Sequence, residues 1–147
     1  MTKNKKNASP MRIVDIPNFT DVTGSGALSI PGGTRGFTPI FADTNGDRYP
    51  ELLLAADFGT SKYYRNNTDG TFSNLTLFSG TGLDGNGMGA TVADIDRDGL
   101  PDWYVTSIYS HHRPVSAWIP GTGNMLYLGE GFHGFAERSA QEGVKEG

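Results

Sequence analysis

The residues between Asp94 and Asp102 carry four carboxylates at even positions, with Gly99 between the third and the fourth. Carboxylates this close together repel one another unless a cation lies between them. A hard dication such as Ca²⁺ takes about six to eight oxygen ligands, and a tight loop can point all of these side chains inward. The glycine permits the sharp turn that such a loop needs. The sequence therefore predicts a calcium loop over residues 94–102.

A second loop of the same pattern covers residues 43–51, and its first residue precedes Asp94 by 51 positions. An amide and a longer carboxylate replace two of the aspartates, and Arg48 stands where the later loop has Gly99. A non-glycine residue held in the left-handed conformation costs about 1–2 kcal/mol. We therefore expect the first loop to bind calcium more weakly than the second. Its side chains at the matching positions are Asp43, Asn45, Asp47 and Glu51.

Short apolar or alternating segments flank both loops and predict strands. In the first copy the expected strands are 37–41, 52–56, 61–65 and 72–76, with a hairpin turn at 66–70. In the second copy they are 89–93, 103–109, 124–128 and 135–139, with a turn at 129–131. The spacing from Tyr64 to Phe72 equals that from Tyr127 to Phe135, so the order of elements repeats. The prediction is an all-β chain of two four-stranded units.

Two segments do not fit the repeat. Residues 19–23 resemble a fourth strand without the first three, so we expect an orphan outer strand there. The second copy carries 12 extra residues between its second and third strands, within an inserted loop at 109–123. Loops on a rigid scaffold tend to carry binding residues. The candidates for a ligand in this loop are Tyr109, His111, His112, Arg113 and Trp118.

The predicted organisation follows from these elements. A flexible polar tail occupies residues 1–10, and the orphan strand with its connection occupies 11–36. The first unit spans 37–83 and the second spans 84–147.

At the residues 41–53, 64–72, 92–102 and 135–144 the chain resembles the FG-GAP/VCBS-type repeat of integrin-alpha-like β-propellers. The form found with bacterial ASPIC/UnbV domains is especially similar. The resemblance implies one four-stranded propeller blade per repeat, with a structural Ca²⁺ in the loop between its first and second strands. By position, it implies two calcium ions in all. It adds two backbone carbonyl ligands, one from Tyr49 and one from Leu100, to the side chains of Asp94, Asp96, Asp98 and Asp102 and their counterparts in the first loop.

Composition excludes several classes of protein. The chain has 147 residues, a formal net charge of −4 and no cysteine, which argues against nucleic acid as the main partner and excludes disulfides and thiolate metal sites. Seven of the sixteen acidic residues lie in the two loops, so two bound Ca²⁺ ions would bring the charge to zero. No apolar run is long enough to span a membrane. The basic N-terminus lacks the apolar segment of a complete signal peptide, while calcium loops of low affinity favour an extracellular protein.

Two blades do not close a ring, because propellers typically use about 4–8 blades. We therefore expect the chain to be part of a longer propeller or to assemble with copies of itself, with the orphan strand completing a neighbouring sheet.

No arrangement of nucleophile and base is evident. The first hypothesis is a non-enzymatic, calcium-binding propeller unit that acts in extracellular adhesion, assembly or protein interaction. One alternative is a scaffold or accessory fragment of a larger secreted hydrolase or lyase. Another is a carbohydrate-binding module that uses the loop at 109–120.

Overall fold

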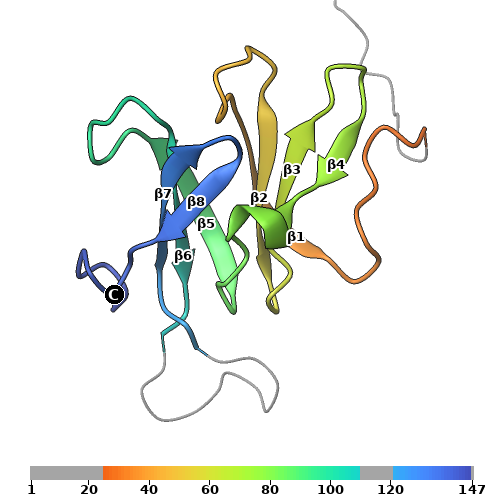
Figure 1. The fold of residues 1–147 in the computed structure, drawn as a ribbon. Coiled ribbons are helices and arrows are strands. Elements are labelled where there is room, and N and C mark those ends of the chain that lie inside the picture. The colour runs from red at the N-terminus through yellow and green to blue at the C-terminus, as the bar shows by residue number, and fades with distance from the viewer. Residues whose placement is uncertain (1–24, 110–120, 147) are drawn as a thin grey trace, which may run out of the picture.

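The computed structural model describes residues 25–109 and 121–146, which form two four-stranded antiparallel sheets and one short helix (Figure 1). The first sheet contains β1 (Arg35–Ala42), β2 (Glu51–Asp57), β3 (Lys62–Asn66) and β4 (Phe72–Asn74), followed by helix α1 (Thr76–Ser79). The second contains β5 (Gly87–Ala93), β6 (Asp102–Ser107), β7 (Met125–Gly131) and β8 (Gly134–Glu137). Within the described ranges, no helix is long and apolar enough to cross a membrane.

The two sheets are built in the same way. In each, the strands pair in chain order, so that every strand neighbours the one before it. Both first strands carry an irregularity in register, between Gly36 and Thr38 in β1 and between Gly87 and Gly89 in β5. These positions are 51 residues apart, which is the spacing of the two acidic loops. The predicted all-β fold with two four-stranded blades is confirmed.

The main hydrophobic core lies between the sheets. Leu53, Ala55 and Tyr63 of the first sheet pack against a cluster from the second that consists of Trp103, Val105, Met125, Tyr127 and Phe135. The Tyr63 and Phe135 rings meet edge to face, with centroids 5.4 Å apart. β2 is buried on both faces, which explains its continuous apolar sequence.

The first strands of the two sheets lie next to each other. The Thr38 hydroxyl of β1 donates a hydrogen bond of 2.9 Å to the carbonyl of Met88 in β5. Four-stranded sheets that meet along their first strands and pack face against face have the arrangement of neighbouring propeller blades.

Several predicted boundaries are wrong, and the strands expected to end at 109 and 139 end at Ser107 and Glu137. The strand expected at 72–76 ends at Asn74, whose side chain accepts a hydrogen bond from the backbone of Thr76, the first residue of α1. The turn expected at 129–131 lies instead at Phe132 and His133, because β7 continues to Gly131 with an irregularity after Gly129. Both turn residues have positive φ angles, of 48° and 67°, as in a two-residue type I′ hairpin turn.

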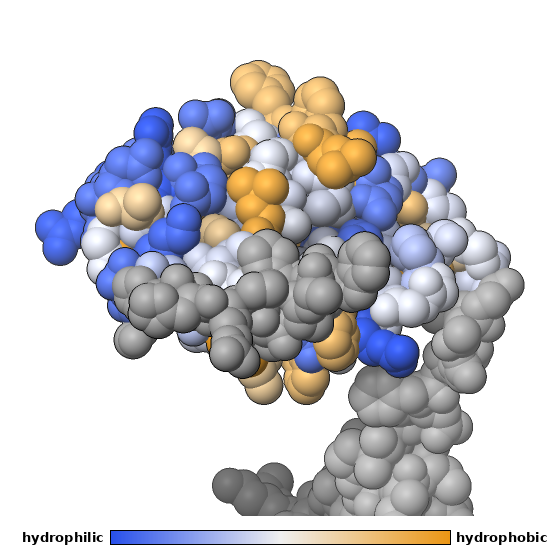
Figure 2. All heavy atoms as spheres, turned by 90° about the horizontal axis from the view of Figure 1, so that it is seen from below, coloured by the Kyte–Doolittle hydropathy of each residue, from blue (hydrophilic) through white to orange (hydrophobic). Residues whose placement is uncertain are grey.

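Apolar side chains are also exposed outside the core. The view from below in Figure 2 shows hydrophobic groups on the surface beside hydrophilic ones. The most exposed large apolar residues of the described chain are Leu77 and Phe132, at 98% and 92%, followed by Phe78. The predicted tail at 1–10 and the predicted orphan strand at 19–23 lie outside the described residues.

Candidate metal centre

Each acidic loop connects the first and second strands of its sheet. Loop 1 (43–51) joins β1 to β2, and loop 2 (94–102) joins β5 to β6. Figure 1 shows both loops at the same end of the molecule, with the β7–β8 turn between them in this view. The flanking residues are paired across each hairpin, Ala42 with Glu51 and Ala93 with Asp102. The ends of both loops are therefore fixed by the sheet.

The two loops share one hydrogen-bond scaffold. When each loop is numbered from 1 to 9, the side chains at positions 1, 3, 5 and 9 accept hydrogen bonds from the backbone N–H groups at positions 6, 5, 7 and 2. In loop 1 the pairs are Asp43–Arg48 at 2.8 Å, Asn45–Asp47 at 2.9 Å, Asp47–Tyr49 at 2.8 Å and Glu51–Thr44 at 3.0 Å. In loop 2 they are Asp94–Gly99 at 3.2 Å, Asp96–Asp98 at 3.1 Å, Asp98–Leu100 at 2.8 Å and Asp102–Ile95 at 2.6 Å. Every side chain predicted as a ligand is held by this scaffold.

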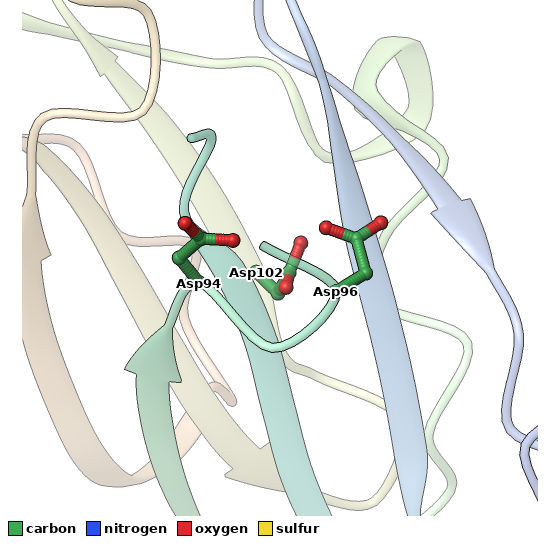
Figure 3. Close-up of side chains that lie close together, drawn as sticks. All are labelled: Asp94, Asp96 and Asp102. Carbon is green, nitrogen blue, oxygen red and sulfur yellow. The ribbon is translucent and has the colours of Figure 1, made fainter. Parts of the chain in front are cut away.

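Loop 2 brings three carboxylates close together. Oxygens of Asp94, Asp96 and Asp102 all lie within 4.8 Å of one another, and Figure 3 shows the first two on either side of the third. The predicted fourth side chain, Asp98, is not part of this close group. Three carboxylates at this distance form a site of strongly negative charge.

The carboxylate at position 9 is fully buried in both loops. Asp102 accepts hydrogen bonds from the backbone of Ile95 and, through Oδ1 at 2.9 Å, from the backbone of Gly129. Glu51 accepts two hydrogen bonds from Thr44 through Oε2, whereas its Oε1 is buried and has no hydrogen-bond partner in the described chain. All of these donors are neutral. A buried charged group without compensation is strongly unfavourable, so both positions favour a bound cation.

Both loops have left-handed residues at positions 4 and 6. In loop 1 these are Gly46 and Arg48, with φ angles of 81° and 72°. In loop 2 they are Arg97 and Gly99, with φ angles of 67° and 90°. The left-handed conformation expected for Arg48 is therefore present, but loop 2 carries an arginine under the same strain at its other left-handed position. Strain at Arg48 is therefore no reason to expect weaker calcium binding at loop 1 than at loop 2. The remaining reason is the neutral amide of Asn45, which stands where loop 2 has the carboxylate of Asp96.

The electrostatics of the two loops differ. Desolvation has the largest effect on Asp96 and raises the pKa of its carboxyl, and the negative charges of Asp98, Asp102 and Asp94 raise it further. Asp43 is also affected most by desolvation, which acts to raise its pKa. Backbone hydrogen bonds, the strongest from Arg48, outweigh this effect and lower the pKa of Asp43 below its ordinary value. Negative charge is thus less well compensated in loop 2, which favours a cation there.

The donor chemistry fits calcium. The side-chain atoms available to a metal at positions 1, 3, 5 and 9 are oxygens of carboxylates or of an amide, and Ca²⁺ prefers oxygen ligands. The remaining ligands would come from the predicted carbonyls of Tyr49 and Leu100 and from water. A bound Ca²⁺ would supply the positive charge that neutralises the clustered carboxylates.

Sequence reasoning missed three side chains, one within loop 1 and two beside it. The hydroxyls of Thr44 and Tyr63 are 2.6 Å apart, and the Tyr63 hydroxyl lies 2.8 Å from Nδ1 of His133 in the β7–β8 turn. Nε2 of His133 lies 3.2 Å from the side-chain nitrogen of Asn45. The sequence carried one signal for His133. The two hairpins have equal spacing, and His133 stands in the second hairpin at the position of Gly70 in the first.

Of the residues predicted to bind a ligand in the inserted loop, only Tyr109 lies within the described part of the chain. Tyr109 forms an isolated bridge with Thr122, and its hydroxyl donates to Glu146 at 3.0 Å. The other candidates lie outside the described residues: His111, His112, Arg113 and Trp118.

The fold and the loops define a class of protein, a propeller-like unit with an acidic loop in each blade. Residues 43–105 match the family described as FG-GAP-like repeat, a segment that begins at the first residue of loop 1 and contains both loops. This segment of the chain is therefore an FG-GAP-type repeat, and FG-GAP repeats are a non-catalytic repeat family. The match does not extend to the ASPIC/UnbV association. Searches of the curated proteins and of the solved structures gave no match.

Proposed function

We propose that the chain is a non-enzymatic pair of β-propeller blades, each stabilised by one structural Ca²⁺. The observation that carries this proposal is the hydrogen-bond scaffold that recurs in both loops and ends, in each, at a fully buried carboxylate. Two unrelated acidic turns would not share four equivalent hydrogen bonds. A bound ion would compensate charges whose described partners are neutral.

The proposed role of calcium is architectural. In both loops the predicted ligands come from one hairpin, so the ion would hold the first and second strands of a blade together at their ends. Binding to the folded state alone stabilises that state, by about 2.7 kcal/mol per site when the free ion exceeds its dissociation constant by about 100-fold.

We further propose that the two blades belong to a larger ring, formed by copies of the chain or by further blades of a longer protein. The second sheet supports this. A cavity of about 230 Å³ on its outer face is lined by Ile95, Asp96, Leu126 and Leu128. By loop position and strand register, Asp96 and Leu126 correspond to Asn45 and Tyr63, which His133 of the next blade contacts in the first sheet. A third blade would have an equivalent place to bind.

An extracellular location and a role in adhesion, assembly or protein interaction complete the proposal. Extracellular modules bind calcium with dissociation constants of about 10⁻⁴–10⁻³ M, and such concentrations occur outside cells. The exposed side chains of Leu77, Phe78 and Phe132 provide apolar surface for a partner.

Calorimetric titration of the chelated protein with Ca²⁺ tests the metal part of the proposal. The expected stoichiometry is two ions per chain, falling to one when Asp43 and Asp47 are changed to Asn. A chain that binds no Ca²⁺ at millimolar concentration would overturn the proposal. Sedimentation tests self-assembly: a particle larger than one chain is expected, and a folded monomer would contradict assembly from copies of this chain.

A further inference from the structure

Four hydrogen bonds connect loop 1 with the second sheet and return to the same loop. The path begins at the side-chain nitrogen of Asn45, which lies 3.2 Å from Nε2 of His133. Nδ1 of His133 in turn lies 2.8 Å from the Tyr63 hydroxyl. The path continues to the Thr44 hydroxyl at 2.6 Å and ends at Oε2 of Glu51 at 3.1 Å. The path therefore begins at position 3 and ends at position 9 of loop 1, and two of the predicted ligands are its end points.

The chemistry of the two end groups fixes the direction of every bond. The Asn45 side-chain nitrogen can only donate, so Nε2 of His133 must accept. A neutral imidazole then carries its proton on Nδ1 and donates it to the Tyr63 hydroxyl. At the other end a carboxylate can only accept, so Thr44 donates to Glu51 and Tyr63 donates to Thr44. All four bonds point the same way, and bonds aligned in this manner strengthen one another.

The groups in the path are held firmly. Tyr63 is fully buried, and burial, the largest effect on it, raises the pKa of its hydroxyl, so that the proton it donates to Thr44 is retained at neutral pH. Its ring packs against Phe135 and lies 6.1 Å from the imidazole of His133, measured between ring centroids. The Thr44 side chain is buried as well.

His133 occupies a strained backbone position. Its φ angle is 67°, and the equivalent residue of the first hairpin is Gly70, with a φ angle of 87°. A side chain in this conformation costs about 1–2 kcal/mol that glycine avoids. Strained residues persist where the surrounding structure or a function requires them. The imidazole contacts a predicted metal ligand, which supplies such a reason.

We propose that His133 is a positioning residue for the cation of loop 1, so that calcium binding at loop 1 and packing of the second blade on the first stabilise each other. The inference rests on the proposed calcium function. By fixing the Asn45 nitrogen, His133 leaves the amide oxygen for the loop. Through Tyr63 and Thr44 it holds Glu51 by one oxygen and leaves Oε1 for the ion. Groups that orient metal ligands typically change metal affinity by about 10–100-fold when they are removed.

Loop 2 lacks this connection and serves as an internal control. Ile95 stands at the position of Thr44, and Leu126 at the position of Tyr63, and neither can form hydrogen bonds through its side chain. Changes to the path should therefore leave calcium binding at loop 2 unaffected.

The test measures calcium affinity of loop 1 in the full chain by calorimetry. Loop 2 is disabled by Asp96→Asn and Asp98→Asn, which remove charge repulsion and leave the backbone unchanged. In this parent, His133→Gly and Tyr63→Phe should each weaken calcium binding about 10-fold or more. The double variant should lose less binding free energy than the sum of the losses in the two single variants. His133→Asn, which tolerates the left-handed conformation, should lie between His133→Gly and the parent.

Two controls separate positioning from backbone effects. Phe132→Gly relieves a neighbouring left-handed residue whose side chain is exposed, and should leave the affinity unchanged. With both loops intact, His133→Gly should lower the free energy of unfolding more in Ca²⁺ than in chelator, whereas a merely structural role would give the same loss in both.

The outcomes are distinct. Equal calcium affinity in the parent and in both single variants would overturn the inference and leave the calcium proposal standing. A parent that binds no calcium would overturn both. If His133→Gly does not fold, Tyr63→Phe, which loses only one oxygen atom, decides alone.

Discussion

Arg97 in loop 2 has the left-handed conformation that Gly46 has in loop 1, with φ angles of 67° and 81°. At position 6 the order is reversed, and Arg48 corresponds to Gly99. Each loop thus has one relaxed and one strained left-handed residue. The backbone path of the loop is the same in both, although the glycine occupies a different position.

Replacing either arginine with glycine should stabilise the protein. Arg48→Gly and Arg97→Gly each relieve about 1–2 kcal/mol of strain, against about 0.5–1 kcal/mol for the greater freedom of glycine in the unfolded chain. The expected net gain is up to about 1.5 kcal/mol, measured by denaturant unfolding in chelator. The reverse changes, Gly46→Ala and Gly99→Ala, should destabilise, although a Cβ at either position meets no atom within 4 Å. Destabilisation by both arginine replacements would contradict this account.

Removing the carboxylate of Asp96 should have opposite effects with and without calcium. In chelator, Asp96→Ala removes a carboxyl whose pKa is raised by desolvation and by the charges of neighbouring aspartates, so the variant should unfold at a higher denaturant concentration than wild type. In calcium it loses a charged ligand and should be less stable than wild type. Asn45→Ala, which removes a neutral ligand, should cost less stability in calcium. An equal effect of Asp96→Ala in both conditions would show that loop 2 holds no ion.

Gly129 should not tolerate a side chain. Its N–H donates to Asp102, and a Cβ at this position would lie 2.6 Å from the carbonyl oxygen of Pro101. Gly129→Ala should therefore destabilise by about 1–3 kcal/mol, the range for overpacked sites, and weaken calcium binding at loop 2. Gly32→Ala is the matched control, because a Cβ there meets nothing within 4 Å. Equal unfolding free energies for the two variants would contradict the close approach of β7 to loop 2.

A buried carboxyl between the sheets should make stability depend on pH. Asp84 is 1% exposed, and burial, the largest effect, raises its pKa, although hydrogen bonds from Ser61 at 2.6 Å and Tyr127 at 3.3 Å act against this. Its pKa in the folded state therefore lies above the unfolded value of 3.8. The folded state binds the proton more tightly, so this group lowers stability progressively as pH rises from about 3.8 through the folded pKa.

Asp84→Asn should remove this contribution. The difference in unfolding free energy between variant and wild type should shift in favour of the variant as pH increases across that window, and become constant above it. Denaturant unfolding at several pH values in fixed calcium measures the difference. A difference that is independent of pH would mean that Asp84 titrates alike in the folded and unfolded chain.

The repeated parts of the molecule could be predicted from the sequence. The spacing of the loops, the hairpin of Tyr64 and Phe72 and the apolar strands are local patterns, and they gave both sheets and the positions of both loops. The predictions that were wrong concern residues with less typical local chemistry. Phe132 and His133 lack the Asn-Gly or Asp-Gly signature of a type I′ turn, and the hydrogen bond from Thr76 to Asn74 accompanies an early end of β4.

The contacts between blades could not be predicted in the same way. His133 and Asn45 are 88 residues apart, and nothing in either segment indicates the other. The burial of Asp84 likewise depends on how the sheets pack. Local patterns predicted the positions of the acidic side chains in each loop, whereas packing determines the groups that support them.

Calcium is proposed to stabilise both blades, and thermal unfolding in Ca²⁺ and in chelator measures this stabilisation. When free Ca²⁺ exceeds the dissociation constant of each site about 100-fold, the two sites together contribute about 5 kcal/mol to stability. This contribution corresponds to a melting-temperature difference of roughly 10 °C or more for a chain of this size. We predict a melting temperature that is lower by this amount in chelator and is restored by added Ca²⁺. Identical melting curves in calcium and in chelator would contradict the account.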